Sequence, residues 1–440
     1  MKKVVKFGGS SVAGAGQFKK VADIIQADKS RRFVVVSAPG KLKSTDTKVT
    51  DLLYQTYDAY AAGKSYQETW KEIQRKYREI VRDLKLNLNL EYEFAKIEEE
   101  MLAGAGRAFM ASRGEYLCAL LMSEYLGFEF IDAKDTIFFH ADGSCDFEKT
   151  NTELSARLEN VKKCVIPGFY GSNENGQIVT FTRGGSDVTG SLVAKAVSAD
   201  EYENWTDVSG FLIADPRIIK EPEIIHTITY SELRELAYMG ASVLHEDAFF
   251  PVRKDGIPIH IKNTNDPSAD GTLIVEATSR KAEYTITGIA GKKGFCSVNI
   301  DKAMMNSEVG FCMKVLNVFA ENGLSIEHMP SGIDTMSVLV HESPFVDKEQ
   351  RVIAGIHRAV APDFVNVEPD LALIAVVGRC MKEKRGTAGR IFSALGHAGI
   401  NIRMIDQGSS ELNIIIGVKE HDFEKAIQAI YNIFVTAEKE

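Results

Sequence analysis

The feature of this sequence that most restricts its fold is an internal repeat in the last third of the chain. When the chain is shifted by 76 residues, FCSVNI (295–300) falls on LALIAV (371–376), and Gly323 falls on Gly399. Each copy reads as a strand, a helix, an N-G or A-G turn and two further strands, and the glycine stands where a helix ends in a left-handed residue. Two such copies predict a pair of small α+β domains.

The part of the chain before the repeat alternates short apolar strands with helical stretches. The β-branched runs are KKVVKF, RFVVVSA, KCVIPGFYG and IPIHIKN, and helical stretches such as 17–27 and 189–198 separate them. Apolar strands that alternate with helices predict an α/β fold, a largely parallel sheet with helices on both faces. Residues 51–112 are polar with helical periodicity. We expect a helical insertion there that packs on one face, exposes the other to solvent and carries no catalytic residues of its own beyond those named below.

Three domains are therefore expected. The first covers residues 1–278, the second 284–360 and the third 361–440, with a linker near 272–283. The run YTITGIA (284–290) precedes the first copy of the repeat and has no counterpart in the same register. It is expected to form an extra strand, which pairs either with the first small domain or with the second.

Composition excludes several classes of function. The net charge of −9 argues against nucleic acid as the main partner. No apolar run is long enough to span a membrane, and glycines interrupt the apolar start of the chain, so no signal peptide is expected. The six cysteines form no C-x-x-C pair, which predicts reduced thiols in a cytoplasmic protein, with neither a metal site nor a disulfide framework.

The stretch KFGGSS (6–11) follows the first predicted strand and indicates phosphate binding. It has neither the P-loop spacing nor the dinucleotide pattern G-x-G-x-x-G. Two glycines after a buried strand still let the backbone approach phosphate oxygens, and the following amides can form an anion nest. Lys6 adds a charge that could neutralise a phosphoryl group in transfer. The alternative is a tight strand-to-helix turn with a solvated lysine.

Three further stretches combine glycines with charged side chains. In FTRGGSDVTG (181–190), Arg183 can grip a carboxylate in bidentate fashion, whereas Asp187 either orients a cation or caps the next helix. In SRGEYLCALLMSEYLG (112–127), Glu115 is expected to open a helix, where acidic residues are favoured for structural reasons alone. The loop ENWTDVSGFLIADPR (203–217) is compatible with nucleotide binding and also with an ordinary turn.

Taken together, these motifs resemble those of the aspartate kinases within the amino acid kinase family. KFGGSS, S-x-G-E, GFYGS with FTRGGSDVTG, and WTDVSG with D-P-R occur in that family's order. The tail GRIFSALGHAGINIRMIDQGSSELNIIIGV (389–418) resembles the last regulatory ACT domain of that family. The resemblance covers nearly the whole chain and implies the amino-acid-kinase fold followed by two ferredoxin-like α+β ACT domains, in the monofunctional form.

The resemblance also implies an activity, its cofactor and the residues that carry it. The γ-phosphoryl group of MgATP would pass to the side-chain carboxylate of L-aspartate, with Mg²⁺ held largely by phosphates and water and no protein ligand named for it. By resemblance, the catalytic residues are Lys6 and Asp187, which organises Lys6. The expected ATP and phosphate contacts are Lys6, Gly8, Gly9, Ser10, Thr206, Asp207, Phe211 and Arg217, and the expected aspartate contacts are Thr50, Glu115, Phe169, Arg183 and Ser186.

Some positions depart from the family pattern. Thr50-Asp51-Leu52-Leu53 stands where many members read T-N-L-L. Leu212, next to Phe211, replaces a tyrosine that often covers the nucleotide. Ser242 replaces a common lysine, so that a phosphate-facing charge is either missing or supplied elsewhere, for example by Lys262. His245 is expected to be a packed helix residue.

The paired ACT domains imply control by an end-product amino acid, lysine first and threonine second. Ser325, Ile326 and Glu327 fall where the family binds the effector, although the same residues also fit a plain strand edge. A homodimer built through the ACT domains, or a tetramer, is expected. The alternatives are another amino acid kinase of the same fold and an inactive ACT-type amino-acid sensor. A nicotinamide-dependent dehydrogenase is weaker because its glycine spacing is missing.

Overall fold

The structure is a computed structural model that describes residues 1–182, 184–241, 248–278 and 283–439. Its contacts divide the chain into two compact units. The first unit contains Met1–Phe211, Ile224–Tyr230 and Val243–Thr278, and the second contains Leu212–Glu223, Ser231–Ser242 and Ser279–Glu440.

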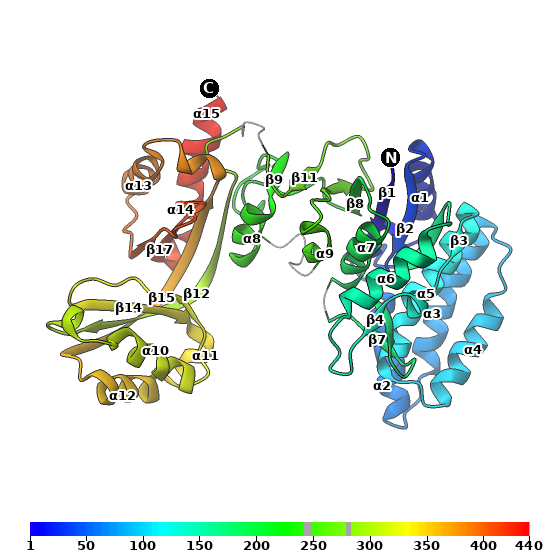
Figure 1. Cartoon of the computed structure of the whole chain (residues 1–440), viewed down its shortest axis with the longest axis horizontal. Helices are drawn as coiled ribbons and strands as arrows, with labels where there is room; N and C mark the ends of the chain where they lie inside the picture. The colour runs from blue at the N-terminus through cyan, green and yellow to red at the C-terminus, as the bar shows by residue number, and fades with distance from the viewer. Residues whose placement is uncertain (183, 242–247, 279–282, 440) are drawn as a thin grey trace. The chain divides into compact units, whose positions relative to one another are not determined.

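The first unit is built on a sheet whose described strands follow the order β3-β5-β2-β1-β8-β10-β11-β9 (Figure 1). All neighbouring strands are parallel except the antiparallel pair β10 and β11. The predicted α/β class with a largely parallel sheet is thus confirmed. The strands are β1 (Lys3–Phe7), β2 (Arg31–Val36), β3 (Glu129–Phe130), β5 (Cys164–Pro167), β8 (Glu201–Thr206), β9 (Thr227–Thr229), β10 (Ile259–Asn263) and β11 (Thr272–Val275).

Helices cover both faces of this sheet because alternate side chains of the central strands are apolar on each side. Phe7 and Trp205 stack on each other on the face that holds the core of α1, α3 and α5. Tyr202 lies on the other face, where a Cβ on Gly190 of α7 would come within 2.4 Å of its hydroxyl oxygen. The helices of this part are α1 (Ala15–Ala27), α2 (Val49–Ala61), α3 (Gln67–Leu84), α4 (Leu90–Leu102), α5 (Arg107–Leu126), α6 (Phe147–Leu158), α7 (Gly185–Ala196) and α9 (Phe250–Arg253).

The expected helical insertion is present as α2, α3, α4 and the start of α5. One face of these helices is packed, since Ile73, Tyr77 and Phe94 are buried in the same core as the sheet. Beside it lies a small second sheet with the order β4-β6-β7. Its elements are β4 (Phe138–Phe139), β6 (Tyr170–Asn173) and β7 (Ile178–Thr180), and the short 3₁₀ turn η2 (Ala133–Asp135) precedes it.

In the second unit, the two copies of the repeat share one sheet with the described order β13-β14-β12-β15-β17-β16. Each copy gives a strand, a helix, two strands and further helices, which is the ferredoxin-like pattern that the family resemblance implied. The strands are β12 (Gly288–Asp301), β13 (Ile326–His328), β14 (Thr335–His341), β15 (Phe364–Val377), β16 (Met404–Asp406) and β17 (Asn413–Lys419). The helices are α8 (Tyr230–Tyr238, which starts in the first unit), α10 (Phe311–Glu321), α11 (Glu342–Val346), α12 (Glu349–Val360), α13 (Thr387–His397), α14 (Phe423–Tyr431) and α15 (Ala437–Lys439).

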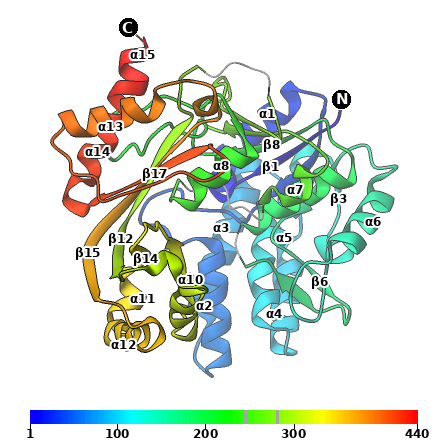
Figure 2. The same ribbon diagram turned by 60° about the vertical axis from the view of Figure 1, so that its left-hand side comes forward.

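The two longest strands of this unit, β12 and β15, run side by side (Figures 1 and 2). The start of β12 lies opposite residues 371–377 of the second copy, and its end lies opposite both β14 and the start of β15. Residues 288–290 of the run YTITGIA therefore belong to the same continuous strand as FCSVNI. No helix within the described ranges is long and apolar enough to cross a membrane.

Candidate active site

An ion pair with a buried lysine lies where β1 ends. Lys6 is only 7 % exposed, and its Nζ lies 2.5 Å from Oδ1 of Asp187 in the first turn of α7. Asn204 lies directly opposite Lys6 in the β1–β8 register. Its Nδ2 donates to Asp187 Oδ1 at 2.8 Å, and its Oδ1 accepts from Lys6 Nζ at 3.4 Å. The lysine is thereby fixed between a carboxylate and an amide.

The glycine turn after β1 brings two backbone segments into close contact. The Gly8 N–H donates to the carbonyl of Trp205, and the Gly40 N–H donates to the carbonyl of Gly9 at 2.8 Å. A Cβ on Gly40 would lie 2.7 Å from the carbonyl carbon of Gly9, so no side chain fits there. A Cβ on Gly8 would lie 3.6 Å from Lys6 Nζ, which shows that the ammonium group lies beside this turn. Backbone and cation together suit a bound phosphate.

A second close approach joins the end of β5 to α7. A Cβ on Gly168 would lie 2.6 Å from Cβ of Ser186, and a Cβ on Gly185 would lie 2.8 Å from the ring of Phe169. Phe169 itself has a φ of 78°, in the left-handed region that side chains rarely adopt. Two of the predicted aspartate contacts, Phe169 and Ser186, are thus brought together by backbone that tolerates no larger residue at the glycines.

Glu115 lies in the middle of α5, so the expectation that it opens a helix is wrong. Helix α5 starts eight residues earlier, at Arg107, and continues through Gly114. Gly114 stands there because its Cβ would come within 2.7 Å of Ala38 Cβ, so packing against the end of β2 outweighs the low helix propensity of glycine. The predicted helix start near Thr189 is also displaced, because α7 begins at Gly185.

The Glu115 carboxyl group is almost completely buried and lacks a full set of partners. Its Oε2 has no hydrogen-bond partner among the described residues. Burial raises the pKa of Glu115 to about 8, against the opposing effects of the Ala38 backbone amide and the charge of Arg113. A buried carboxyl group with an unsatisfied oxygen suits a cationic ligand group, which would supply both a hydrogen bond and a charge.

The predicted nucleotide contacts lie near the end of β8 and beyond it. Thr206 is the last residue of β8, and its Oγ1 donates to Asp207 Oδ1. Phe211 is buried, and its N–H donates to Thr272 Oγ1 at 2.8 Å. Arg217 lies in the second unit, where it is well exposed and paired with Asp215.

Lys262 does not lie beside Lys6. It is in register with Trp205, next to Asn204 along β8, and therefore belongs to the opposite face of the sheet. Its Nζ lies 5.6 Å from the centre of the Trp205 ring and donates to the carbonyl of Ala269. Of the remaining predicted residues, Ser10 lies in the 3₁₀ turn η1 (Gly9–Val12) and Thr50 in the first turn of α2. Arg183, Ser242 and His245 lie outside the described residues.

Two participants in this geometry were not predicted. Asn204 joins Lys6 to Asp187, and its only sequence signal is a polar residue inside the run EYENWT. Gly40 packs on the glycine turn from a loop that lies more than thirty residues from it in sequence. The A-P-G of that loop indicates a turn, but not its partner.

Comparison with known proteins identifies the family. Residues 1–263 match the Amino acid kinase family, and residues 374–434 match the ACT domain. Aspartokinase 3 of Bacillus subtilis is 40% identical over 98% of this chain and 98% of its own length. The chain belongs to the aspartokinases. This confirms the predicted family, the amino-acid-kinase fold with C-terminal ACT domains, and an enzyme of the aspartate kinase type.

Solved aspartokinase structures agree with this assignment. The crystal structure of aspartate kinase from Clostridium acetobutylicum is 48% identical and has a TM-score of 0.90, covering 99% of this chain and 100% of that one. Escherichia coli aspartokinase III in complex with aspartate and ADP, in its R-state, is 25% identical with a TM-score of 0.72, over 98% of this chain and 99% of that one. The same enzyme in complex with lysine and aspartate, in its T-state, is 26% identical with a TM-score of 0.71 over the same shares.

Proposed function

We propose that this aspartokinase transfers the γ-phosphoryl group of ATP to the side-chain carboxylate of L-aspartate and forms 4-phospho-L-aspartate, the first step towards lysine, threonine and methionine. The observation that carries the proposal is the Lys6 ammonium group, held by Asp187 and Asn204 beside the Gly8–Gly9 turn. The reaction is expected to take place in the cytoplasm.

Lys6 supplies the charge that phosphoryl transfer needs. The acceptor carboxylate is already ionised at neutral pH, so catalysis consists of positioning and charge neutralisation, without a strong base. Asp187 and Asn204 hold the ammonium group in one place before the substrates arrive, so little reorganisation is required in the transition state. The amides of the glycine turn would contact the phosphate oxygens.

Glu115 supplies the contact that selects an amino acid. Its buried carboxyl group, with one oxygen unsatisfied, would accept the α-ammonium group of aspartate. Phe169 and Ser186 would form the adjacent wall, with Thr50 at the rim. Arg183, by resemblance, would bind the α-carboxylate.

We infer that Mg²⁺ enters with the nucleotide. Within the described ranges, no group of three His, Cys, Asp or Glu side chains is placed to hold a metal ion. Such an ion would be held by phosphate oxygens and water, as Mg²⁺ commonly is, and it would neutralise phosphate charge.

For regulation, we propose an effector amino acid at Ser325, Ile326 and Glu327, lysine first and threonine second. Glu327 is well buried in the second unit, where it accepts from the Tyr238 hydroxyl at 2.5 Å and lies 3.4 Å from His341 Nε2. An effector ammonium group would join these contacts. The lysine complex of the E. coli relative supports this choice. A homodimer through the ACT domains, or a tetramer, would carry the response.

The test is acyl-phosphate formation trapped as a hydroxamate with hydroxylamine, with aspartate and glutamate compared as acceptors. Hydroxamate is expected from aspartate, with a loss of about 10²-fold or more in kcat for Lys6→Met. The matched control is Lys29→Met, at an exposed lysine of the same unit. No hydroxamate from aspartate would refute the proposal and favour the amino-acid sensor, whereas full activity in Lys6→Met would refute the role given to Lys6.

The regulatory part has its own readout. Lysine and threonine are titrated separately and together, and the molar mass is followed by light scattering. Inhibition that Glu327→Gln weakens is the expected result. An activity that responds to neither amino acid would leave the kinase standing and reduce the ACT pair to an assembly device.

A further inference from the structure

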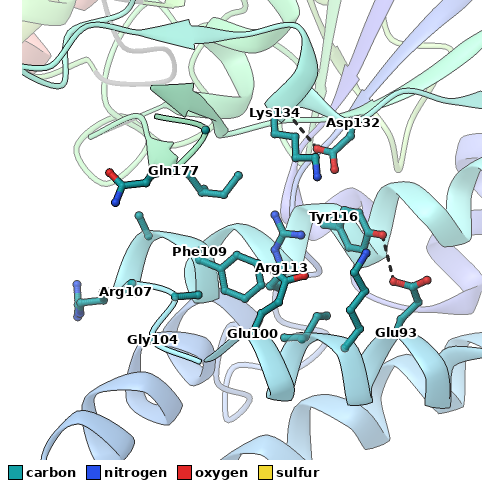
Figure 3. Close-up of a pocket in the computed structure, with 17 residues that line it drawn as sticks. Glu93, Glu100, Gly104, Arg107, Phe109, Arg113, Tyr116, Asp132, Lys134 and Gln177 are labelled. Atoms are coloured by element: carbon teal, nitrogen blue, oxygen red, sulfur yellow. Dashed lines mark hydrogen bonds between the residues drawn. The ribbon is translucent and has the colours of Figure 1, made fainter. Parts of the chain in front are cut away.

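A cavity of about 490 Å³ lies in the first unit, between helices α4 and α5 on one side and the β6–β7 region with η2 on the other (Figure 3). None of the residues assigned above to catalysis, nucleotide or aspartate lines it. Its volume falls in the range of small-molecule sites. Figure 3 shows side chains from both walls directed towards the same space.

Arg113 is the residue of this cavity that needs an explanation. It is only 6 % exposed, and its guanidinium group lies 4.5 Å from the ring centres of both Phe109 and Tyr116. Within the described part of the chain, its hydrogen bonds end at Ser112 Oγ alone, at 3.1 and 2.9 Å, and it forms no ion pair. A buried charge without a counter-ion is costly, and aromatic faces offset only part of that cost. The guanidinium group retains donors for an anion.

Three acidic residues line the cavity: two of them, Glu93 and Asp132, accept hydrogen bonds from neighbouring groups, and the third, Glu100, is exposed. Glu93 accepts from the Tyr116 hydroxyl at 3.0 Å. Asp132 accepts from the Tyr170 hydroxyl at 2.7 Å and from the backbone N–H of Lys134 at 3.1 Å. Lys134 and Lys96 also line the cavity, and both residues are exposed enough to move towards a ligand. The lining thus offers a rigid, desolvated guanidinium group with mobile ammonium groups near it.

We propose that this cavity binds a small oxyanion, a carboxylate or a phosphate, which pairs with Arg113 and Lys134. Arginine is suited to this task because its planar fork matches the oxygens of a carboxylate or a phosphate in bidentate fashion. The aromatic rings on either side hold the fork in place, so that little side-chain entropy is lost on binding.

The site also has a connection to substrate binding, and this part rests on the proposed function. Arg113 and Glu115 lie two positions apart on α5, and the charge of Arg113 lowers the pKa of Glu115 against the effect of burial. An anion on Arg113 would cancel that charge and favour the protonated, neutral form of Glu115. Because a neutral carboxyl group attracts an ammonium group less, the bound anion is expected to raise KM for aspartate while kcat stays unchanged.

The first experiment measures binding alone, so that it stands whether or not the kinase assignment holds. The full-length protein is saturated with a non-hydrolysable ATP analogue, Mg²⁺ and aspartate, and binding of inorganic phosphate and of malonate is measured by equilibrium dialysis at constant ionic strength. The two probes distinguish the phosphate from the carboxylate. Arg113→Gln is expected to weaken binding about tenfold or more and Lys134→Gln about threefold, since charge-assisted hydrogen bonds are lost.

Lys64→Gln is the matched control, at an exposed lysine of the same helical region outside the cavity, and it should bind as the wild type does. Because Arg113→Gln removes a packed side chain, Lys134→Gln and Arg113→Lys test the site if that variant fails to fold. Equal binding in all variants, or none in the wild type, would overturn the proposal and leave Arg113 a stacked structural residue.

The second experiment measures KM for aspartate with and without the anion that binds. A rise in KM is expected, and in Lys134→Gln the same rise should require about threefold more anion. Binding without any change in KM would keep the site and refute its connection to Glu115. If the protein binds the anion but forms no hydroxamate, the anion site stands and the proposed kinase function fails.

Discussion

Replacing Glu115 by glutamine should stabilise the first unit in a way that depends on pH. The Glu115 pKa is raised by burial from 4.5 to about 8. The unfolded chain therefore loses this proton at a lower pH than the folded chain does, and folding stability falls as pH rises from 4.5 to about 8. Below this window the wild type carries a neutral group, as the glutamine variant does at every pH.

The magnitude follows from the same shift. A difference of ~3.5 pKa units corresponds to on the order of 5 kcal/mol at high pH. The folded state relaxes around the charge, and the glutamine amide requires hydrogen-bond partners of its own. Both effects reduce the gain in unfolding free energy, so we expect a few kcal/mol. For a unit of this size, such a gain raises Tm by about 5–10 °C. The gain should appear at pH 8.5 and be nearly absent at pH 5.

Tryptophan fluorescence is the appropriate assay because both tryptophans of the chain, Trp70 and Trp205, are buried in the first unit. Thermal unfolding of Glu115→Gln and of the wild type, without ligands, is compared at the two pH values. Glu124→Gln, at an exposed position of the same helix, controls for loss of surface charge. A difference between Glu115→Gln and wild type that is the same at pH 5 and pH 8.5 would refute the reasoning, because it would mean that Glu115 titrates normally.

Three further predictions concern the proposed reaction. KM for aspartate should fall as pH rises from 6 to 8, since Glu115 must be ionised to accept the substrate ammonium group; initial rates across this range measure it, and a flat profile would contradict it. Asn204→Leu should lower kcat about tenfold without unfolding the protein, because it removes the amide that holds Lys6 and Asp187 in place. Steady-state kinetics measure kcat and circular dichroism checks the fold, and an unchanged kcat would count against a positioning role. Gly40→Ala should weaken ATP binding through contact with the Gly9 backbone, whereas Gly16→Ala, which meets nothing within 4 Å, should not; calorimetric titration with ATP compares them, and equal affinities would show that the turn can adjust.

The parallel sheet and the paired small domains could be predicted because they depend on patterns within short segments. Apolar runs of five or six residues are local, and the repeat can be recognised by comparing one segment of the chain with another, without knowledge of which residues are in contact. The ion pair of Lys6 with Asp187 was expected only through the family resemblance, because it joins the ends of a strand and a helix far apart in the chain. Asn204 was missed for the same reason, since its contact with Lys6 depends on the β1–β8 register, which no local pattern reveals.

The error about Glu115 has a different physical origin. Glycine is a poor helix former, so a glycine followed by an acidic residue favours a helix start. In the structure, Gly114 lies inside α5 because the helix packs against Ala38 too closely for a side chain. Such a contact is a tertiary requirement, and it outweighs a propensity difference of about 1 kcal/mol.

Because Glu115 lies inside α5, this helix carries two buried charged groups, Arg113 and Glu115. Successive residues of a helix are separated by about 100°, so Arg113 and Glu115 project from nearly opposite sides of α5. One is a buried cation beside a cavity, and the other is a buried acid with an unsatisfied oxygen near the end of β2. Because both charges are shielded from water, each affects the ionisation of the other more strongly than surface groups would. The packing that misled the sequence prediction thus keeps Glu115 inside α5, where an anion bound at Arg113, as proposed, would influence the proposed binding of aspartate on the other side of the helix.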